Sequence, residues 1–139
     1  MTAKEYLQQI KKKDDEINRK IERVEELRSS IASTRSPTLT ADRVQTSVAG
    51  DKVSETVAKI VDLEAEINAD IDSFVDLKEE IWRKVESCCN SKERKIIKLH
   101  YFDYISIHLI AVKHMRSDIR WIQRTHKSAL NKIQVYLNS

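Results

Sequence analysis

The sequence predicts an all-α protein: an antiparallel helical hairpin (coiled coil) over residues 1–90, followed by a helix-turn-helix unit over residues 91–139. The chain contains one Gly and one Pro, so the turn residues that β-hairpins need are missing. Its 34% charged and 40% apolar residues are typical of long amphipathic helices. Apolar residues also recur at heptad spacing in two separate segments.

Both heptad segments belong to the predicted hairpin. A seven-residue repeat marks a long helix whose seam packs against another helix. The first seam consists of Ala3, Ile10, Ile17, Val24 and Ile31, with Leu7, Ile21 and Leu27 between them. The second consists of Val53, Ile60, Ile67, Phe74, Ile81 and Cys88, with Val57, Leu63, Ile71, Leu77 and Val85 between them.

The segment between the two arms, residues 32–50, is predicted to be a loop. It holds the only Pro and the only Gly and is dense in Ser and Thr, so it cannot continue either arm. The loop lets the chain reverse, which places Val24 beside Ile60 and Ile10 beside Phe74. Its conformation is left open, as is the choice between arms that pair within one chain and arms that swap between two.

The second arm carries more apolar residues than one partner helix would cover. Val61, Val75 and Trp82 lie beside its seam, which predicts a homodimer that pairs the helical arms of two chains. For the end of this arm, from Trp82 onward, the alternative is packing against the C-terminal unit. Cys88 and Cys89 are expected to be reduced thiols, because a disulfide between neighbours in the chain would be strained.

The charges of the chain divide unevenly between its two parts. Residues 1–90 hold 15 Lys and Arg against 19 Asp and Glu, a balance of −4, and residues 91–139 hold 10 against 3, a balance of +7. A small unit with this positive charge suits a polyanion such as double-stranded DNA. No apolar run approaches the roughly 20 residues needed to cross a bilayer, and the N-terminus lacks a signal-like core, so we expect a soluble, cytoplasmic protein without a membrane partner.

The C-terminal stretch Ser106–Ile133 is predicted to form two helices joined by a tight turn. The expected N-caps in this unit are Ser91, Ser106 and Ser117. The last helix is expected to bury one side and to expose the other. The buried side consists of Ile119, Ile122, Ala129, Leu130 and Ile133, and the exposed side of Arg120, Gln123, Arg124 and Lys127, with Asn131 one turn beyond.

This distribution is typical of a helix that reads DNA. The apolar stripe seats the helix, while basic and amide side chains face base edges and phosphates in the major groove. We expect Arg120 and Gln123 to contact bases and Arg124 and Lys127 to contact phosphates, with Arg116 and Ser117 at a phosphate near the helix start. The alternative is a solvated helix face.

The same stretch also carries a family resemblance. LHYFDYISIHLIAVKHMRSDIRWIQRTHKSAL, residues 99–130, resembles the region-four helix-turn-helix of bacterial sigma factors, although Leu109 replaces the usual acidic or amide residue and the turn has no Gly. The whole chain is similar to small prophage proteins of Gram-positive bacteria. The similarity rests on Lys-Glu-Tyr-Leu at 4–7, on AKIVDLEAEINADIDSFVDLKEEI at 58–81 and on Ile-Arg-Trp at 119–121.

The resemblance implies a phage-encoded transcription regulator akin to late-gene activators, acting in the host cytoplasm with host RNA polymerase as a further partner. Two alternatives stay open. One is a DNA-binding assembly protein, such as a small terminase-like subunit, and the other is a polymerase-binding module that reads no DNA. The DNA sequence recognised, and activation against repression, are not given by the sequence.

Other functions have little support in the sequence. The four His and two Cys match no metal-ligand spacing, so we expect no metal and no cofactor. No glycine-rich phosphate loop and no nucleophile with a placed base is present, so we expect no catalytic residues and no enzyme. Trp121 is expected to pack in the core or to be half-buried.

Overall fold

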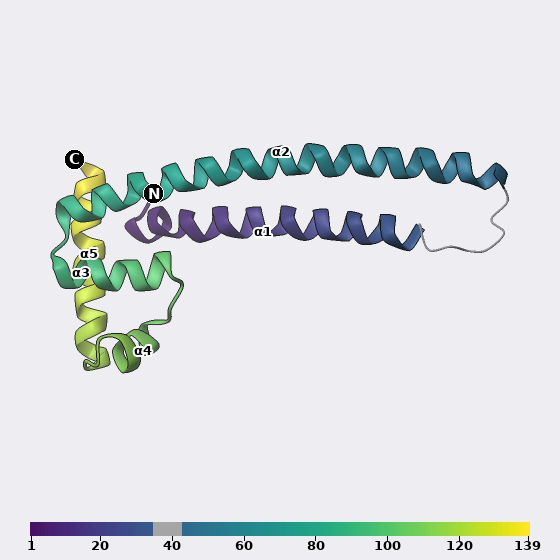
Figure 1. Cartoon of the computed structure of the whole chain (residues 1–139). Coiled ribbons are helices and arrows are strands. Elements are labelled where there is room, and N and C mark those ends of the chain that lie inside the picture. The colour runs from purple at the N-terminus through teal and green to yellow at the C-terminus, as the bar shows by residue number, and fades with distance from the viewer. Residues whose placement is uncertain (35–42) are drawn as a thin grey trace. The chain divides into compact units, whose positions relative to one another are not determined.

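The computed structural model describes residues 1–34 and 43–139, and the elements within these ranges are all helical (Figure 1). Two long helices, α1 (Ala3–Thr34) and α2 (Arg43–Cys88), pack antiparallel. Shorter elements follow: α3 (Ser91–Ile97), the π-helical turn η1 (Lys98–Phe102), α4 (Ile107–Leu109), the π-helical turn η2 (Ile110–His114) and α5 (Ile119–Asn138). The prediction of an all-α fold is therefore confirmed for the residues described.

The two long helices extend further into residues 32–50 than predicted, so the predicted loop is too long. Helix α1 continues to Thr34 and α2 begins at Arg43, so both helices enter the stretch 32–50 that was expected to be loop. Gly50 lies inside α2 with open space around it, so a single Gly did not end the helix. The rest of the predicted loop, 35–42, lies outside the described residues.

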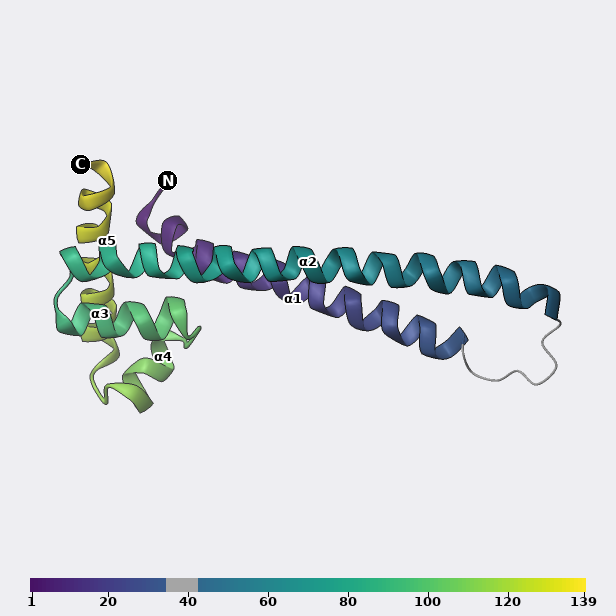
Figure 2. The ribbon, with the colours of Figure 1, turned by 45° about the horizontal axis from the view of Figure 1, so that its top comes forward.

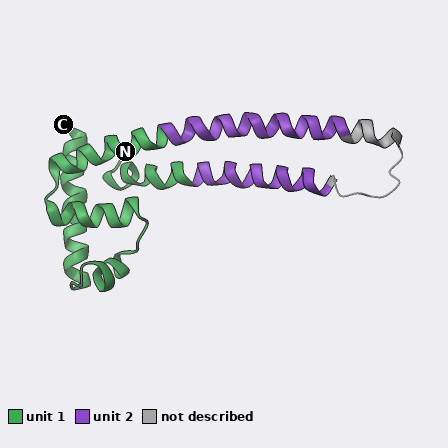
Figure 3. Ribbon diagram, viewed as in Figure 1, with its two compact units in different colours: residues 1–14, 73–139 green, residues 15–72 purple. Residues whose placement is uncertain are grey.

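The chain forms two compact units (Figure 3). Unit 1 comprises residues 1–14 and 73–139, and unit 2 comprises residues 15–72. The sequence predicted a boundary at residue 90 between a hairpin domain and a helix-turn-helix domain. This domain division stays a prediction. None of the helices within 1–34 and 43–139 is long and apolar enough to span a membrane.

Unit 2 is a pair of antiparallel helical segments with a narrow apolar seam. Among its described side chains, the buried ones are those of Ile17, Val24, Leu27, Ile60 and Ile67, and the pairing of Val24 with Ile60 stays a prediction. The prediction was wrong for three seam residues, because Ile21, Val57 and Ile71 are exposed. The neighbouring positions Lys20, Thr56 and Asp70 are half-buried instead, because the seam follows three- and four-residue spacing through them.

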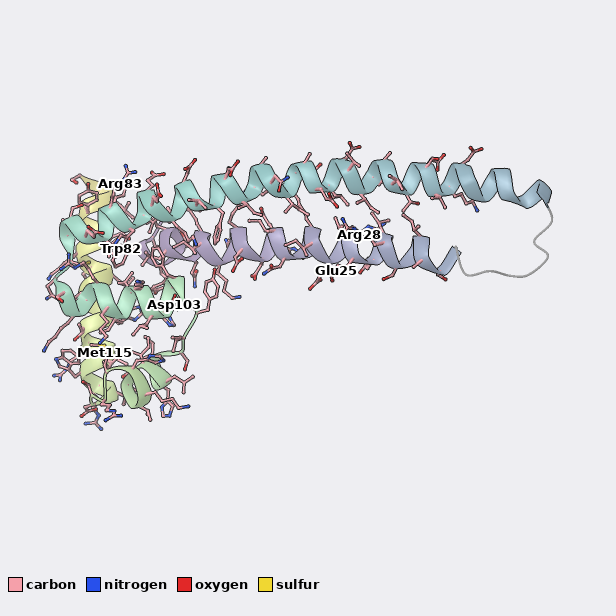
Figure 4. All side chains as sticks on the ribbon, viewed as in Figure 1. Glu25, Arg28, Trp82, Arg83, Asp103 and Met115 are labelled. Atoms are coloured by element: carbon pink, nitrogen blue, oxygen red, sulfur yellow. The ribbon has the colours of Figure 1, made fainter. Side chains whose placement is uncertain are left out.

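Ion pairs join the two helices of unit 2. Lys20 donates a hydrogen bond to Asp70 over 2.6 Å, and its Nζ lies 3.5 Å from Glu66 Oε2. This hydrogen bond raises the pKa of Lys20. Arg28, on the side of α1 that faces α2, pairs with Glu64 (Figure 4). Charged residues therefore link the helix pair, and two of them, Lys20 and Asp70, take the seam places that were predicted for the neighbouring Ile21 and Ile71.

Unit 1 has a thicker core, to which α1, α2, α3, η1 and α5 all contribute. One cluster of buried side chains consists of Ala3, Tyr6, Leu7, Ile10, Ile81, Val85, Cys89, Ile97, Tyr101, Ala129 and Ile133. The Trp82 ring packs edge-on against Phe102, with centroids 5.4 Å apart, so the end of α2 packs within this unit, as the stated alternative for this segment predicted. Cys88 and Cys89 are free thiols, and burial raises the pKa of Cys89 to about 12.

A second cluster in unit 1 seats the last helix. Its buried members are Ile96, Ile110, Ala111 and Ile122, and Trp121 packs against them half-buried, as predicted. Helix α5 lies beside α3 in both views of the ribbon (Figures 1 and 2). The core side of α5 is therefore fixed by neighbouring elements of the same unit.

Candidate nucleic-acid interface

The outward side of α5 carries the predicted polar side chains. Residues three or four apart in a helix share a side, so positions 120, 123, 124, 127 and 131 form one continuous strip. All five side chains, Arg120, Gln123, Arg124, Lys127 and Asn131, are exposed. We call these five residues the α5 strip. The structure places them together, with two guanidinium groups, one ammonium group and two amides on one side.

The opposite side of α5 is buried, as predicted, except at its start. Ile122, Ala129 and Ile133 have almost no exposed surface. Leu130 is half-buried, whereas Ile119 is exposed and was wrongly assigned to the apolar side. Ile119 is the first residue of α5, one turn before the first buried position, Ile122. The strip is thus held outward by a core that begins at Ile122.

The start of α5 differs from the prediction. Asp118, rather than Ser117, is the N-cap, and its carboxylate accepts a hydrogen bond from the Arg120 backbone N–H over 2.9 Å. A carboxylate suits this position because the N-terminal end of a helix carries positive partial charge. Ser117 belongs to the preceding turn instead: it is half-buried, and its hydroxyl donates to the Met115 carbonyl over 3.1 Å. Ser117 is therefore less accessible to a phosphate than expected.

Arg116 occupies a strained position in the turn between η2 and α5. Its φ of 47° lies in the left-handed region, which a residue with a Cβ adopts at a cost. The adjacent Met115 is half-buried against the second cluster and anchors the turn (Figure 4). The Arg116 side chain is exposed, so the turn presents a further cation next to the start of the strip.

The first helix of the pair is capped by Ser106, as predicted. The Ser106 hydroxyl accepts a hydrogen bond from the Leu109 backbone N–H over 3.2 Å. Ile110 and Ala111 are buried, and Ile107 is half-buried. Leu109 and Val112 are exposed on the outer side of α4 and η2.

Sequence reasoning missed the most buried charged residue of the chain's described part, Glu93. The expected N-cap of α3 was Ser91, but the cap is Asn90, which forms a capping box with Glu93. Asn90 Oδ1 accepts from the Glu93 N–H over 2.9 Å, and Glu93 Oε1 accepts from the Asn90 N–H over 2.8 Å. The signal was present as Asn-x-x-Glu at 90–93, a capping-box pattern.

The Glu93 carboxylate also ties α3 to α5. It accepts a hydrogen bond from the Ser128 hydroxyl over 2.9 Å and one from Lys132 Nζ over 2.7 Å. Burial on its own would raise the pKa of Glu93, but the bonds from Asn90, Lys132 and Ser128 outweigh it and lower this pKa. Glu93 is therefore ionised near neutral pH, and its negative charge is paired with Lys132 of the same unit.

A second polar group holds the other flank of α5. The Tyr101 hydroxyl lies 2.8 Å from His126 Nε2. Burial, followed by the nearby His100 and Lys4, lowers the pKa of His126 to about 4, so this imidazole is neutral at pH 7 and its Nε2 can accept a hydrogen bond from the Tyr101 hydroxyl. His100 is bonded through Nδ1 to the Ile105 carbonyl. Among the described residues, no group of three His, Cys, Asp or Glu side chains is placed to hold a metal ion.

Comparisons of the chain with models of protein families, with curated proteins and with solved structures find no match. The resemblance to sigma region four and to prophage proteins therefore stays a prediction from the sequence.

Proposed function

We propose that the protein is a DNA-binding transcriptional regulator in which α4, η2 and α5 act as a helix-turn-helix and α5 is the recognition helix. The observation that carries this proposal is the α5 strip, which is exposed along its whole length while the opposite side of α5 is anchored by Ile122, Ala129 and Ile133. A helix that enters the major groove needs both properties. The +7 balance of residues 91–139 adds the electrostatic attraction that DNA binding requires.

The side chains of the strip suggest separate roles. Arg120 and Gln123 have the geometry for paired hydrogen bonds, Arg with guanine and Gln with adenine, so we assign them to base reading. Arg124, Lys127 and the nearby Arg116 are assigned to backbone phosphates, and Asn131 extends the strip by one turn. On this assignment Arg120 and Gln123 set sequence preference, whereas the other cations mainly set affinity.

The regulator is proposed to be phage-encoded and similar to late-gene activators, which the prophage-like motifs support. Its partners would be promoter or operator DNA and host RNA polymerase. Leu109 and Val112, both exposed on α4 and η2, favour one rival function, a module that contacts polymerase without reading DNA. Replacing Arg120 and Arg124 with Ala would leave the activity of such a module unchanged and would abolish that of a DNA reader.

The hairpin is proposed to make a homodimer. In unit 2, Val57, Val61 and Ile71 are exposed on α2, together with Ile21 on α1. A two-helix pair leaves such a surface open to water, and a second copy of the same pair would cover it in a four-helix bundle. Sedimentation velocity should give the mass of a dimer, and Val61→Asp should convert it to a monomer. An eight- or nine-fold ring would favour the assembly-protein alternative instead.

The direct test is a mobility-shift titration of the full chain on duplexes from upstream regions of the encoding phage, at physiological salt. We expect preference for one sequence over random duplex. Arg120→Ala and Gln123→Ala should reduce this preference, while Lys59→Ala, which removes an exposed charge from unit 2, should not. Equal affinity for all duplexes would contradict the proposal.

A further inference from the structure

A groove runs between α3 and α5, on the flank of the α5 strip. It has a volume of about 470 Å³. Its lining residues are Asn90, Lys92 and Glu93 from the start of α3, and Trp121, Arg124, Thr125, Ser128 and Lys132 from α5. Arg124 belongs both to this lining and to the strip, so the groove continues the exposed polar surface of α5 sideways toward α3.

The charges in the groove do not cancel. Three cations, Lys92, Arg124 and Lys132, line it against one carboxylate, Glu93, which leaves a balance of +2. The carboxylate is buried, and both its oxygens accept hydrogen bonds from within the protein. Lys92 and Arg124 are exposed, so an anion entering the groove meets their positive charge rather than the charge of Glu93.

The walls of the groove are fixed in place. Glu93 joins α3 to Ser128 and Lys132 on α5, and the Thr125 hydroxyl donates to the Trp121 carbonyl over 2.8 Å. Lys92 Nζ lies 5.2 Å from the centre of the Trp121 ring, a distance at which a cation is attracted to an indole face. The cations are thus arranged along two packed elements instead of being scattered over a mobile surface.

We propose that this groove is a phosphate-binding site for the DNA backbone, adjacent to the bases that the α5 strip reads. The proposal rests on the function proposed above and adds α3 to the interface through Lys92. Phosphate oxygens would accept hydrogen bonds from Lys92 and Arg124, and Lys132 would add charge while it stays bonded to Glu93. Such contacts position the protein on the duplex and carry no sequence information.

The test measures binding of the full chain to two fluorescent duplexes, a preferred sequence and a random one, over a range of salt concentrations. Each lost phosphate contact lowers the log–log salt slope by about 0.9, which corresponds to about an 8-fold loss of affinity at 0.1 M salt. Lys92→Ala should therefore weaken binding to both duplexes by about the same factor. It should also reduce the magnitude of the log–log salt slope by about 0.9, the value for one phosphate contact. Lys59→Ala removes the same charge from unit 2 and should change neither quantity.

A second measurement follows Trp121 itself. In a Trp82→Phe background Trp121 is the only tryptophan, because the chain contains two. Its fluorescence should change when either duplex is added, and inorganic phosphate at the same phosphate concentration should cause a much smaller change. An equal response to inorganic phosphate would identify a site for free phosphate and would overturn the backbone assignment.

The outcomes separate the two proposals. If Lys92→Ala binds both duplexes with unchanged affinity and slope while Arg120→Ala still loses sequence preference, the groove holds no DNA phosphate and the proposed function stands. If Lys92→Ala lowers affinity for the preferred duplex alone, Lys92 acts in sequence reading and the backbone assignment fails. If the unmodified chain binds neither duplex, both proposals fail.

Discussion

The two units differ in how completely their cores exclude water. In unit 1, Ile81, Ile96 and Ile122 have no exposed surface, whereas in unit 2 the best-buried of the described side chains, such as Ile17 and Ile67, keep 5% and 8%. A pair of helices can shield a seam residue from two sides only, while unit 1 surrounds its core with several elements. Unit 1 can therefore hold the α5 strip rigidly without further partners, and unit 2 has more to gain from a second copy.

The units also use their polar residues differently. Unit 1 buries one carboxylate, Glu93, and surrounds it with donors from two elements. Unit 2 places Lys20 and Asp70 at a half-buried seam, where water still reaches both side chains. The first arrangement fixes the relation of α3 to α5, and the second chiefly selects a register between helices. Mutations that remove comparable groups from the two units should separate these roles.

The largest expected difference comes from removing one core isoleucine in each unit. Ile122→Ala should cost about 4 kcal/mol of unfolding free energy, near the upper end for such changes, because the surrounding cluster leaves little room to collapse. Ile67→Ala in unit 2 should cost about 2 kcal/mol, since its site is thinly packed and already reached by water. Urea unfolding followed by circular dichroism measures both. Equal costs would contradict the contrast between the two cores.

Glu93→Ala is expected to have the next largest effect. It removes the capping box and leaves Ser128 and Lys132 without their shared acceptor, which should cost about 2–3 kcal/mol. Because the pKa of Glu93 is lowered in the folded state, its stabilising contribution is present above its ordinary pKa of 4.5 and is lost as pH falls through the folded value. The stability of the unmodified chain should therefore fall in that acidic range more steeply than that of Glu93→Gln, as urea midpoints at several pH values would show.

The sequence predicted those features that depend on periodicity. Heptad spacing and the scarcity of Gly and Pro predicted the long helices, and three- and four-residue spacing in residues 119–133 predicted an exposed strip opposite Ile122. The pattern failed where neighbouring positions competed for the same seam. Choosing Ile71 over Asp70 followed hydrophobicity, whereas the helix geometry of the folded pair turned Asp70 inward.

Residue spacing in the sequence could not predict features that depend on contacts between residues far apart in the chain. The α3–α5 groove requires Lys92 to lie beside Trp121, and nothing in a local pattern states which side of α3 faces α5. The left-handed turn at Arg116 was hidden for a related reason, because the residue that usually marks such a turn is Gly and none is present there. The sequence predicted that a polar residue caps the start of each helix. It did not decide between adjacent candidates such as Ser117 and Asp118.

Arg116→Gly should change stability and DNA binding in opposite directions. Glycine adopts the left-handed conformation without a Cβ clash, so the unfolding free energy should rise by about 1 kcal/mol. Loss of the exposed guanidinium should at the same time weaken binding to any duplex, if Arg116 contacts a phosphate. Arg116→Ala is the matched control, since it removes the same charge without relieving the backbone. A gain in stability for both variants would show that the charge, and not the backbone conformation, is unfavourable.

The smallest effect is expected for the Lys20–Asp70 pair of unit 2. The pair is partly exposed, so its attraction competes with water and with the entropy of two side chains, and such pairs contribute little to stability. A double-mutant cycle with Lys20→Met and Asp70→Leu measures the coupling separately from any other contacts of either residue. We expect a small favourable coupling that disappears at about 1 M salt, where the screening length falls to about 3 Å. A large coupling that persists at high salt would mean that water is excluded from the seam, and unit 2 would then resemble unit 1 more closely than its exposed fractions indicate.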